Sequence, residues 1–278
     1  MRLALPFLLV VACSKAAATT PDAGSPCGDM PCTLYDSPEA AFARVLEDRP
    51  AVLAIGETHA QRDFDGASTT ERFAEKLLPV LRGRSKDLVV ELWVGNPSCN
   101  TAQKRAMKQV ASAQAEVTAS QRPKNQSEFV ALYNAARKND MKAHVLVPPC
   151  DDYDKIVHSP DDLDSMLEII ARLSAAEVTK ALPAENNEPV LVYGGAMHND
   201  LMPRPGHERW SFGPELDHAT DHRYVELDLI VPEMISESDA WMAQPWYPHY
   251  DAHAQGKKTI LFRTRPRSYA LIFAPAIR

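Results

Sequence analysis

Apolar residues follow two rhythms along this chain, and the alternation between them predicts its elements. Continuous apolar runs bounded by glycine, proline or charge predict buried strands, whereas apolar residues three and four positions apart predict helices. We expect strands at 51–55, 87–93, 143–147, 189–193, 224–231, 259–263 and 268–273, and helices at 37–48, 69–81, 100–116, 127–139 and 161–182.

The order of these elements predicts the fold class. Strands alternate with helices from 51 to 193, which indicates parallel strands joined by helical crossovers. The last two strands flank a turn at Arg265-Pro266 and predict an antiparallel hairpin. The expected fold is therefore α/β: a single domain over 36–278, with a mostly parallel sheet flanked by helices and a C-terminal antiparallel hairpin.

The N-terminus has the features of an export signal. Arg2 precedes a nearly continuous apolar stretch from Leu3 to Ala12, and Cys13 follows it. This pattern resembles a bacterial lipoprotein signal, in which the cysteine is lipidated after cleavage; a simple signal peptide and an uncleaved anchor are the alternatives. A spanning helix needs about 20 apolar residues. We expect a signal peptide at 1–12, lipidation of Cys13 and a flexible tether over 13–35.

Four further cysteines lie in the exported part of the chain: Cys27, Cys32, Cys99 and Cys150. An even number in an exported chain indicates disulfides, with three possible connectivities. Cys27 and Cys32 are close in sequence, whereas Cys99 and Cys150 each follow a predicted strand. We expect the pairs Cys27–Cys32 and Cys99–Cys150. A thiolate metal site is the alternative, but no Cys-x-x-Cys spacing supports it.

Two glycine-to-histidine motifs follow predicted strands. Gly56-Glu57-Thr58-His59 comes after the strand at 51–55, and Gly195-Ala196-Met197-His198 comes after the strand at 189–193. We expect each glycine to permit a tight turn at the strand end. Each histidine then lies at the sheet edge where open α/β sheets bind ligands.

Glu91 is the third candidate residue, because it interrupts the apolar run at 87–93. A buried carboxylate needs a compensating partner, which is a metal, an arginine or a set of hydrogen bonds. If the three strands are parallel neighbours, His59, Glu91 and His198 converge at one edge. Two imidazoles and a carboxylate suit a divalent metal (manganese, cobalt, zinc or iron) with an open position for water. Structural roles, as a salt bridge or as hydrogen-bonded turn histidines, are the alternative.

A metal of this kind lowers the pKa of bound water to about 7 and supplies hydroxide at neutral pH. Glu57, two residues before His59, is expected to accept the proton of that water or to act as a further ligand. The predicted catalytic residues are thus Glu57, His59, Glu91 and His198.

These residues resemble a known superfamily. Gly56-Glu57-Thr58-His59, Glu91 and Gly195-Ala196-Met197-His198 are similar to motifs of the group that contains erythromycin esterases, ChaN-type iron-regulated lipoproteins and Tiki/TraB proteins. The similarity extends over roughly residues 36 to 276 and implies an α/β fold. Tiki members imply metal-dependent proteolysis, esterase members imply histidine and glutamate acting on water, and ChaN members imply haem binding. The layout with Cys13 is closest to the ChaN-like lipoproteins.

Secondary candidates lie beside the two histidines. Arg62 is expected to orient an anionic group or Glu57, and Asn199 or Asp200 to bond the second nitrogen of His198. Glu226 and Asp228 share one strand face and are candidates for pairing with a buried cation, although structural roles are favoured.

The expected function is that of an exported, lipid-anchored protein of the bacterial cell envelope, on the outer membrane or the periplasmic face. Its site is expected to hydrolyse a small molecule or peptide with a divalent metal. The alternative is a haem- or iron-binding lipoprotein without catalysis, with a histidine as axial ligand. A third possibility is a purely structural lipoprotein. The net charge of -7 excludes a protein that wraps nucleic acid, because phosphate binding needs a basic surface.

Overall fold

The computed structural model describes residues 25–26, 30–117, 121, 125–182 and 188–276. The expected signal peptide, Cys13, Cys27 and most of the expected tether lie outside the described residues. None of the described helices is long and apolar enough to cross a bilayer.

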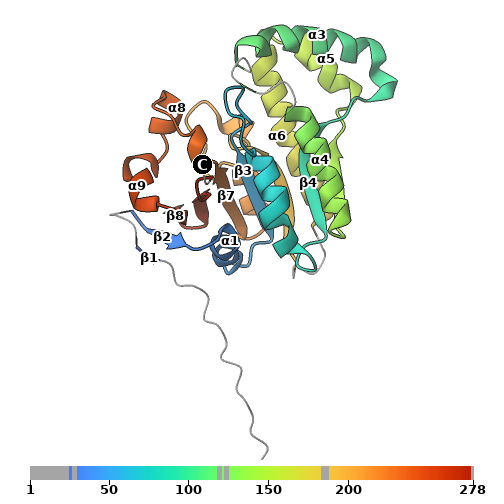
Figure 1. Cartoon of the computed structure of the whole chain (residues 1–278). Helices are drawn as coiled ribbons and strands as arrows, with labels where there is room; N and C mark the ends of the chain where they lie inside the picture. The colour runs from blue at the N-terminus through green and yellow to red at the C-terminus, as the bar shows by residue number, and fades with distance from the viewer. Residues whose placement is uncertain (1–24, 27–29, 118–120, 122–124, 183–187, 277–278) are drawn as a thin grey trace, which may run out of the picture.

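One mixed sheet organises the described residues (Figure 1), and its strand order is β1-β2-β8-β9-β7-β3-β6-β4-β5. From β9 to β5 every pair of neighbours is parallel, whereas β8, β2 and β1 extend the sheet by antiparallel pairing. The strands are β1 (Ser25–Pro26), β2 (Cys32–Tyr35), β3 (Val52–Glu57), β4 (Asp87–Trp93), β5 (Lys142–Leu146), β6 (Val190–Gly195), β7 (Tyr224–Ile230), β8 (Thr259–Arg265) and β9 (Ser268–Ile272).

Helices cover both faces of the sheet. One face of the sheet is covered by α1, by α4 and by the helical segment that follows β3 (Figure 1). The other face is covered by α6, and α3 and α5 pack together beside α6. The longer helices are α1 (Pro38–Leu46), α3 (Asn100–Val117), α4 (Asn125–Lys138), α5 (Cys150–His158), α6 (Asp162–Ala181) and α7 (Gly213–Ala219). The short ones are α2 (Thr69–Arg72), η1 (Phe73–Leu77), η2 (Leu78–Leu81), η3 (Pro97–Cys99), η4 (Glu208–Trp210), η5 (Pro232–Met234), α8 (Asp239–Met242), η6 (Tyr247–His249) and α9 (Ala252–Gln255).

The predicted fold class is confirmed. The condition for His59, Glu91 and His198 to share one sheet edge is met, because β3, β6 and β4 are adjacent and parallel. The strands β8 and β9 form the expected antiparallel hairpin, and Arg267 in its turn has a φ of 66°. Alternate residues of β3 enter the two cores: Leu53 and Ile55 pack on the α1 and α4 side, and Val52 and Ala54 on the α6 side.

The predicted helix at 69–81 is present but is wound irregularly. It begins as α2, continues as the π-helical η1 and ends as the 3₁₀ turn η2. Pro79 explains the change, because it has no backbone N–H to donate and its ring crowds the preceding turn. The N–H of Leu78 instead bonds the carbonyl of Phe73, five residues earlier.

The tether ends earlier than expected. Residues 32–35 form β2, which pairs with β8, and Cys32 and Tyr35 are buried. Pairing satisfies the backbone of this segment and covers the edge of β8. Cys32 is disulfide-bonded; Cys27, its expected partner, lies outside the described residues, so that pairing stays a prediction.

The disulfide Cys99–Cys150 is confirmed, with a Cα–Cα distance of 5.2 Å. Cys99 follows β4 and Cys150 follows β5, and because these strands are parallel neighbours both cysteines reach the same sheet edge. Cys150 begins α5, a helix that the sequence analysis missed.

Candidate functional site

Two glycines lie side by side in the sheet and form the floor of the candidate site. Gly56 of β3 is opposite Gly194 of β6, and Glu57 is opposite Gly195. The first motif does not begin with the expected tight turn, because Gly56 and Glu57 lie within β3. The second motif does: Gly195 ends β6, and its carbonyl accepts a hydrogen bond from the N–H of His198 at 2.9 Å. Gly56 and Gly194 are required for close approach: a Cβ on Gly194 would come within 3.0 Å of the carboxylate of Glu91, and one on Gly56 would lie 2.5 Å from Asp228 Oδ1.

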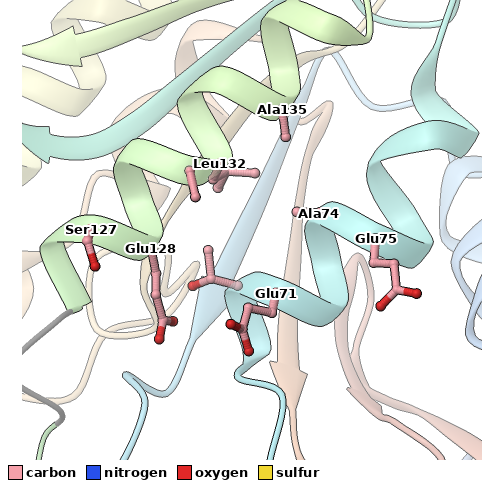
Figure 2. Close-up of a pocket in the computed structure, with 9 residues that line it drawn as sticks. Glu71, Ala74, Glu75, Ser127, Glu128, Leu132 and Ala135 are labelled. Atoms are coloured by element: carbon pink, nitrogen blue, oxygen red, sulfur yellow. The ribbon is translucent and has the colours of Figure 1, made fainter.

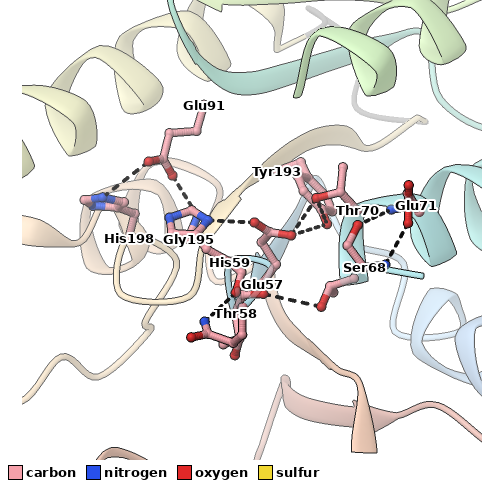
Figure 3. A network of polar contacts seen from close by, with 12 residues as sticks. Glu57, Thr58, His59, Ser68, Thr70, Glu71, Glu91, Tyr193, Gly195 and His198 are labelled. Carbon is pink, nitrogen blue, oxygen red and sulfur yellow. Dashed lines mark hydrogen bonds and ion pairs between the residues drawn. The ribbon is translucent and has the colours of Figure 1, made fainter. Parts of the chain in front are cut away.

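Glu57, the last residue of β3, is buried and fully engaged by three side chains (Figure 3). Its Oε2 accepts hydrogen bonds from Thr70 Oγ1 at 2.6 Å and Tyr193 Oη at 3.0 Å, and its Oε1 contacts His59 Nδ1 at 2.7 Å. Burial raises the pKa of the Tyr193 hydroxyl well above its usual range, so this group keeps its proton and donates. These contacts direct Glu57 toward His59.

His59 lies two residues beyond β3, and its Nδ1 is held by Glu57. Burial lowers the pKa of His59, but the hydrogen bond to Glu57 and the charges of Glu57, Glu91 and Glu128 outweigh burial and raise it to about 9. The ring of Phe129 packs edge-on against the imidazole at 5.9 Å. With Nδ1 occupied, Nε2 is the nitrogen that remains for a ligand.

Glu91 projects from β4 on the face opposite Glu57 and crosses Gly194. Its Oε2 accepts a hydrogen bond from the N–H of Gly195 at 2.7 Å. A backbone amide is thus one of the partners that compensate the carboxylate of Glu91. The Nε2 of His198 also lies 3.8 Å from Glu91 Oε1, a contact that compensates the carboxylate only when the imidazole is protonated.

His198 is buried, and Trp210 fixes its ring. The Nδ1 of His198 lies 2.6 Å from the backbone carbonyl of Trp210. A carbonyl only accepts, so Nδ1 carries the hydrogen of the neutral ring and Nε2 presents a lone pair toward Glu91.

Two of the three predicted ligands, His59 and Glu91, converge at the end of β6, and His198 lies beside Glu91. A Cβ added to Gly195 would lie 3.4 Å from His59 Nε2 and 3.7 Å from Glu91 Oε2. Donor types and tautomers fit a divalent metal, because metal-binding histidines characteristically anchor the other ring nitrogen on a carboxylate or backbone carbonyl. However, the described residues contain no group of three or more histidine, cysteine, aspartate or glutamate side chains arranged to hold a metal ion.

The secondary candidates do not have the positions expected for them. Trp210, rather than Asn199 or Asp200, holds the second nitrogen of His198. Arg62 is exposed, and the described partners of Glu57 do not include it.

Asn199 instead joins a second polar cluster on the α6 side of the sheet. Its Nδ2 donates to Asp228 Oδ1 at 3.1 Å, across Gly56. In the same cluster, Glu226 Oε2 accepts hydrogen bonds from the N–H of Leu201 and from Ser268 Oγ, both at 2.9 Å. Burial raises the pKa of Glu226 to about 7 and that of Asp228 well above its usual range. For Glu226, these two donors agree with the structural role that the sequence analysis favoured over a buried cation.

Sequence reasoning missed the residues that orient the site: Thr70, Tyr193 and Trp210. Tyr193 lies in a predicted buried strand, and a buried tyrosine hydroxyl needs a hydrogen-bond partner. The sequence could therefore have predicted that this hydroxyl contacts another polar residue. Thr70 follows the helix cap at Ser68, so only its burial reveals it. Trp210 acts through its backbone carbonyl, which every residue has, so its residue type could not predict this contact.

Comparison of the chain with protein-family models, with curated proteins and with solved structures gives no match.

Proposed function

We propose that this chain is a hydrolase that activates water between His59, Glu91 and His198. The observation that supports the proposal is the shared anchoring of the two imidazoles: each is held through Nδ1, and each leaves Nε2 for the reacting molecule. Hydrolysis of an ester or amide needs a proton acceptor for water and a proton donor for the leaving group. Two fixed imidazoles beside one carboxylate offer both.

Each residue has a defined part in this proposal. His198 Nε2 accepts a proton from water, and Glu91 Oε1, 3.8 Å away, stabilises the imidazolium that results. The Gly195 N–H holds Glu91 in place. Glu57 acts as a positioning residue, because its contacts face the ring of His59; this replaces its expected part as a proton shuttle.

In a second, metal-dependent version of the proposal, His59 Nε2, His198 Nε2 and Glu91 would hold a divalent metal, and His198 would then not be the base. When bound, the metal would lower the pKa of a water molecule that it holds and so favour hydroxide at neutral pH. The resemblance to the esterase and Tiki superfamily supports this choice, as does the tautomer that each Nδ1 partner imposes.

The pKa of His59, about 9, favours a second role for this residue when no metal is present. A protonated imidazole at neutral pH donates from Nε2, and the leaving group of an ester or amide needs such a donor. The same four residues then hydrolyse with His198 as base and His59 as acid.

The test is hydrolysis of a panel of aryl esters and unstructured peptides by the full chain in detergent. His198→Ala and Glu91→Gln should each reduce the rate about 10²–10⁴-fold, provided that circular dichroism shows both variants folded. Chelator treatment followed by Mn²⁺, Co²⁺ or Zn²⁺ decides between the two versions, since only the metal-dependent one loses and regains activity. Hydrolysis that survives in the His59→Ala/His198→Ala double variant contradicts the proposal.

We also propose that the chain works on the bacterial cell envelope, anchored to the membrane through a lipid on Cys13. The support is the sequence of residues 2–13 alone.

A further inference from the structure

The two imidazoles of the candidate site are held by different kinds of groups. A side-chain carboxylate, that of Glu57, holds His59 on the face of the sheet that α4 covers. Thr70, which donates to Glu57, also lines a groove of about 480 Å³ between η1 and α4 (Figure 2). The Nδ1 of His198 is held instead by a backbone carbonyl, that of Trp210, 2.6 Å away. The position of His198 therefore depends on what fixes the segment around Trp210.

The backbone of this segment is tied to the turn after β6. The N–H of Phe212 donates to the carbonyl of His198 at 3.0 Å, and Ser211 Oγ donates to the carbonyl of Asp200 at 2.6 Å. Phe212 is buried in the core on the α6 side of the sheet. These contacts fix the chain just after Trp210, on one side of its carbonyl.

The side chain of Trp210 fixes the chain on the other side of that carbonyl. Its indole Nε1 donates to Asp164 Oδ1 at 2.5 Å, in a hydrogen bond that joins residues 46 positions apart. The imidazole of His207 stacks on the indole, with the ring centroids 4.1 Å apart. Because side chains occupy a few staggered rotamers, an indole anchored at its far end restricts the backbone that carries it, and with it the direction of the carbonyl.

Asp164 is itself held at the start of α6. Its backbone N–H donates to the side chain of Asp161, the N-cap of that helix, at 2.9 Å. Its Oδ2 accepts a hydrogen bond from Arg209 at 3.2 Å. The helix α6 packs on the sheet, and a side chain on such an element is positioned more precisely than one on a loop. Asp164 thus offers a fixed acceptor to the indole of Trp210.

We propose that Asp164 is a positioning residue for His198 and acts through Trp210. Asp164 holds the indole, the indole directs the carbonyl, and the carbonyl keeps the hydrogen of the neutral imidazole on Nδ1. The consequence for activity rests on the proposed hydrolase, in which His198 Nε2 presents a lone pair. A displaced carbonyl would let the hydrogen move to Nε2, and a ring in that form neither accepts a proton at Nε2 nor binds a metal there.

A purely structural role for Asp164 is the alternative, because the same contacts also hold η4 against α6. The two roles differ in what the loss of Asp164 changes. A structural role lowers the stability of the protein and leaves the tautomer of His198 in the folded state as it was. The positioning role changes that tautomer while the protein stays folded.

The first measurement reads the tautomer of His198 directly. The full chain in detergent, labelled with ¹⁵N in its histidines and treated with a chelator, is studied by NMR at about pH 8.5, where an ordinary imidazole is neutral. The signals of His198 are those that His198→Gln lacks. Wild type should carry the hydrogen on Nδ1, whereas Asp164→Ala should move it in part to Nε2. Trp210→Phe should do the same, since it keeps the carbonyl and an aromatic ring but loses the donor to Asp164.

Three further variants separate position from stability. Asp164→Asn keeps an oxygen that accepts from the indole and should retain the wild-type tautomer. Asp162→Ala removes an acidic side chain from the same helical turn, outside the contacts described above, and should retain it as well. The double variant Asp164→Ala/Trp210→Phe should shift the tautomer no further than either single variant, because both changes break the same hydrogen bond.

Hydrolysis is the second measurement. With the aryl esters and peptides that test the proposed hydrolase, Asp164→Ala and Trp210→Phe should each lower the rate about 10-fold. Asp164→Asn should keep most of the wild-type rate. Circular dichroism establishes that each variant is folded, and if Asp164→Ala is not, Trp210→Phe tests the same hydrogen bond.

The outcomes separate this inference from the proposed function. A wild type that hydrolyses nothing, together with the tautomer shift in the single variants, would refute the hydrolase and keep the positioning role of Asp164. Three results would overturn the inference whatever the rates: a wild type with the hydrogen on Nε2, folded single variants that keep the wild-type tautomer, or a double variant whose shift is the sum of the single ones.

Discussion

Glu91 Oε2 and the backbone N–H of Gly195 form a 2.7 Å hydrogen bond that joins opposite sides of the candidate site. To reach that N–H, the side chain of Glu91 crosses Gly194. Gly194 and Gly195 are neighbours in β6, but they have different structural roles in this contact. Gly194 makes room for a side chain, and Gly195 supplies an amide and an open space above it.

Alanine at each of these two glycines should therefore have a different effect. Gly194→Ala forces a Cβ into the carboxylate of Glu91 and should lower the free energy of unfolding by about 1–3 kcal/mol. Gly195→Ala places its Cβ 3.4 Å from His59 Nε2, an ordinary contact, so stability should stay within about 1 kcal/mol of wild type. That Cβ occupies the space between His59 and Glu91, so hydrolysis and metal binding should fall. Urea unfolding and metal calorimetry check the pair; a stable Gly194→Ala variant would contradict the geometry.

Glu57→Gln should disturb His59 through its tautomer. Either the amide nitrogen faces Nδ1 of His59 and moves its hydrogen to Nε2, or the amide turns and loses the bonds from Thr70 and Tyr193. We expect activity to fall about 10–100-fold, and Tyr193→Phe, which keeps the charge, to have the smaller effect.

NMR titration gives an independent measure of the same contact. The pKa of His59 should be about 9 in wild type and should move toward 6.5 in Glu57→Gln. Because the folded value lies above the unfolded one, the stabilisation from this pair is complete below pH 6.5 and is lost as the pH rises through about 9. An unchanged His59 pKa in Glu57→Gln would remove Glu57 from its assigned role.

Glu226→Gln should change how stability depends on pH. Burial and the charge of Asp200 raise the pKa of Glu226 to about 7 from 4.5, despite the hydrogen bonds from Leu201 and Ser268. The folded state therefore holds the proton longer, and wild type should lose stability as the pH rises from 4.5 to 7. Glutamine keeps both acceptor contacts without the charge. The variant should match wild type at pH 4.5 and exceed it by roughly 1–3 kcal/mol at pH 8.

Thermal unfolding between pH 4.5 and 8 measures this difference, with exposed Glu237→Gln as the control. Parallel pH profiles for Glu226→Gln and wild type would show that Glu226 is ionised without cost.

Loss of the Cys99–Cys150 disulfide should destabilise the protein by about 2–4 kcal/mol, because the bridge closes a long loop between cysteines that are 51 positions apart. A Cys99→Ala/Cys150→Ala variant, compared with wild type by chemical unfolding, tests this. Hydrogen exchange should localise the change to α3 and α5, whose starts the bridge ties together. Equal stability of the two proteins would show that the packing of α3 against α5 suffices.

Cys13→Ser should prevent lipidation. We expect the variant to remain unprocessed or to leave the membrane fraction, as judged by fractionation and by mass spectrometry of the mature N-terminus. Processing and membrane retention like those of wild type would disprove the lipoprotein assignment.

The sequence alone determined the seven strands from β3 to β9 and the Cys99–Cys150 pair, whereas it offered the adjacency of β3, β6 and β4 only as a condition. The local periodicity of apolar residues predicts which residues are buried and in which kind of element. The alternation of strands and helices then leaves few possible topologies for the sheet. It also showed that Glu91 needs a partner, since a carboxylate within Val89-Val90 and Leu92-Trp93 is costly to bury unpaired.

Only the tertiary structure decided what those partners are. The N–H of Gly195 and the carbonyl of Trp210 belong to the backbone, which every residue shares, so no residue type marks them. Tyr193 reaches Glu57 across 136 positions because β3 and β6 pair in one particular register. The groove between η1 and α4 likewise arises where two helices distant in sequence pack with alanines between them. Local patterns encode which residues are buried; contacts between distant segments depend on register and helix packing, which form only when the whole sheet is assembled.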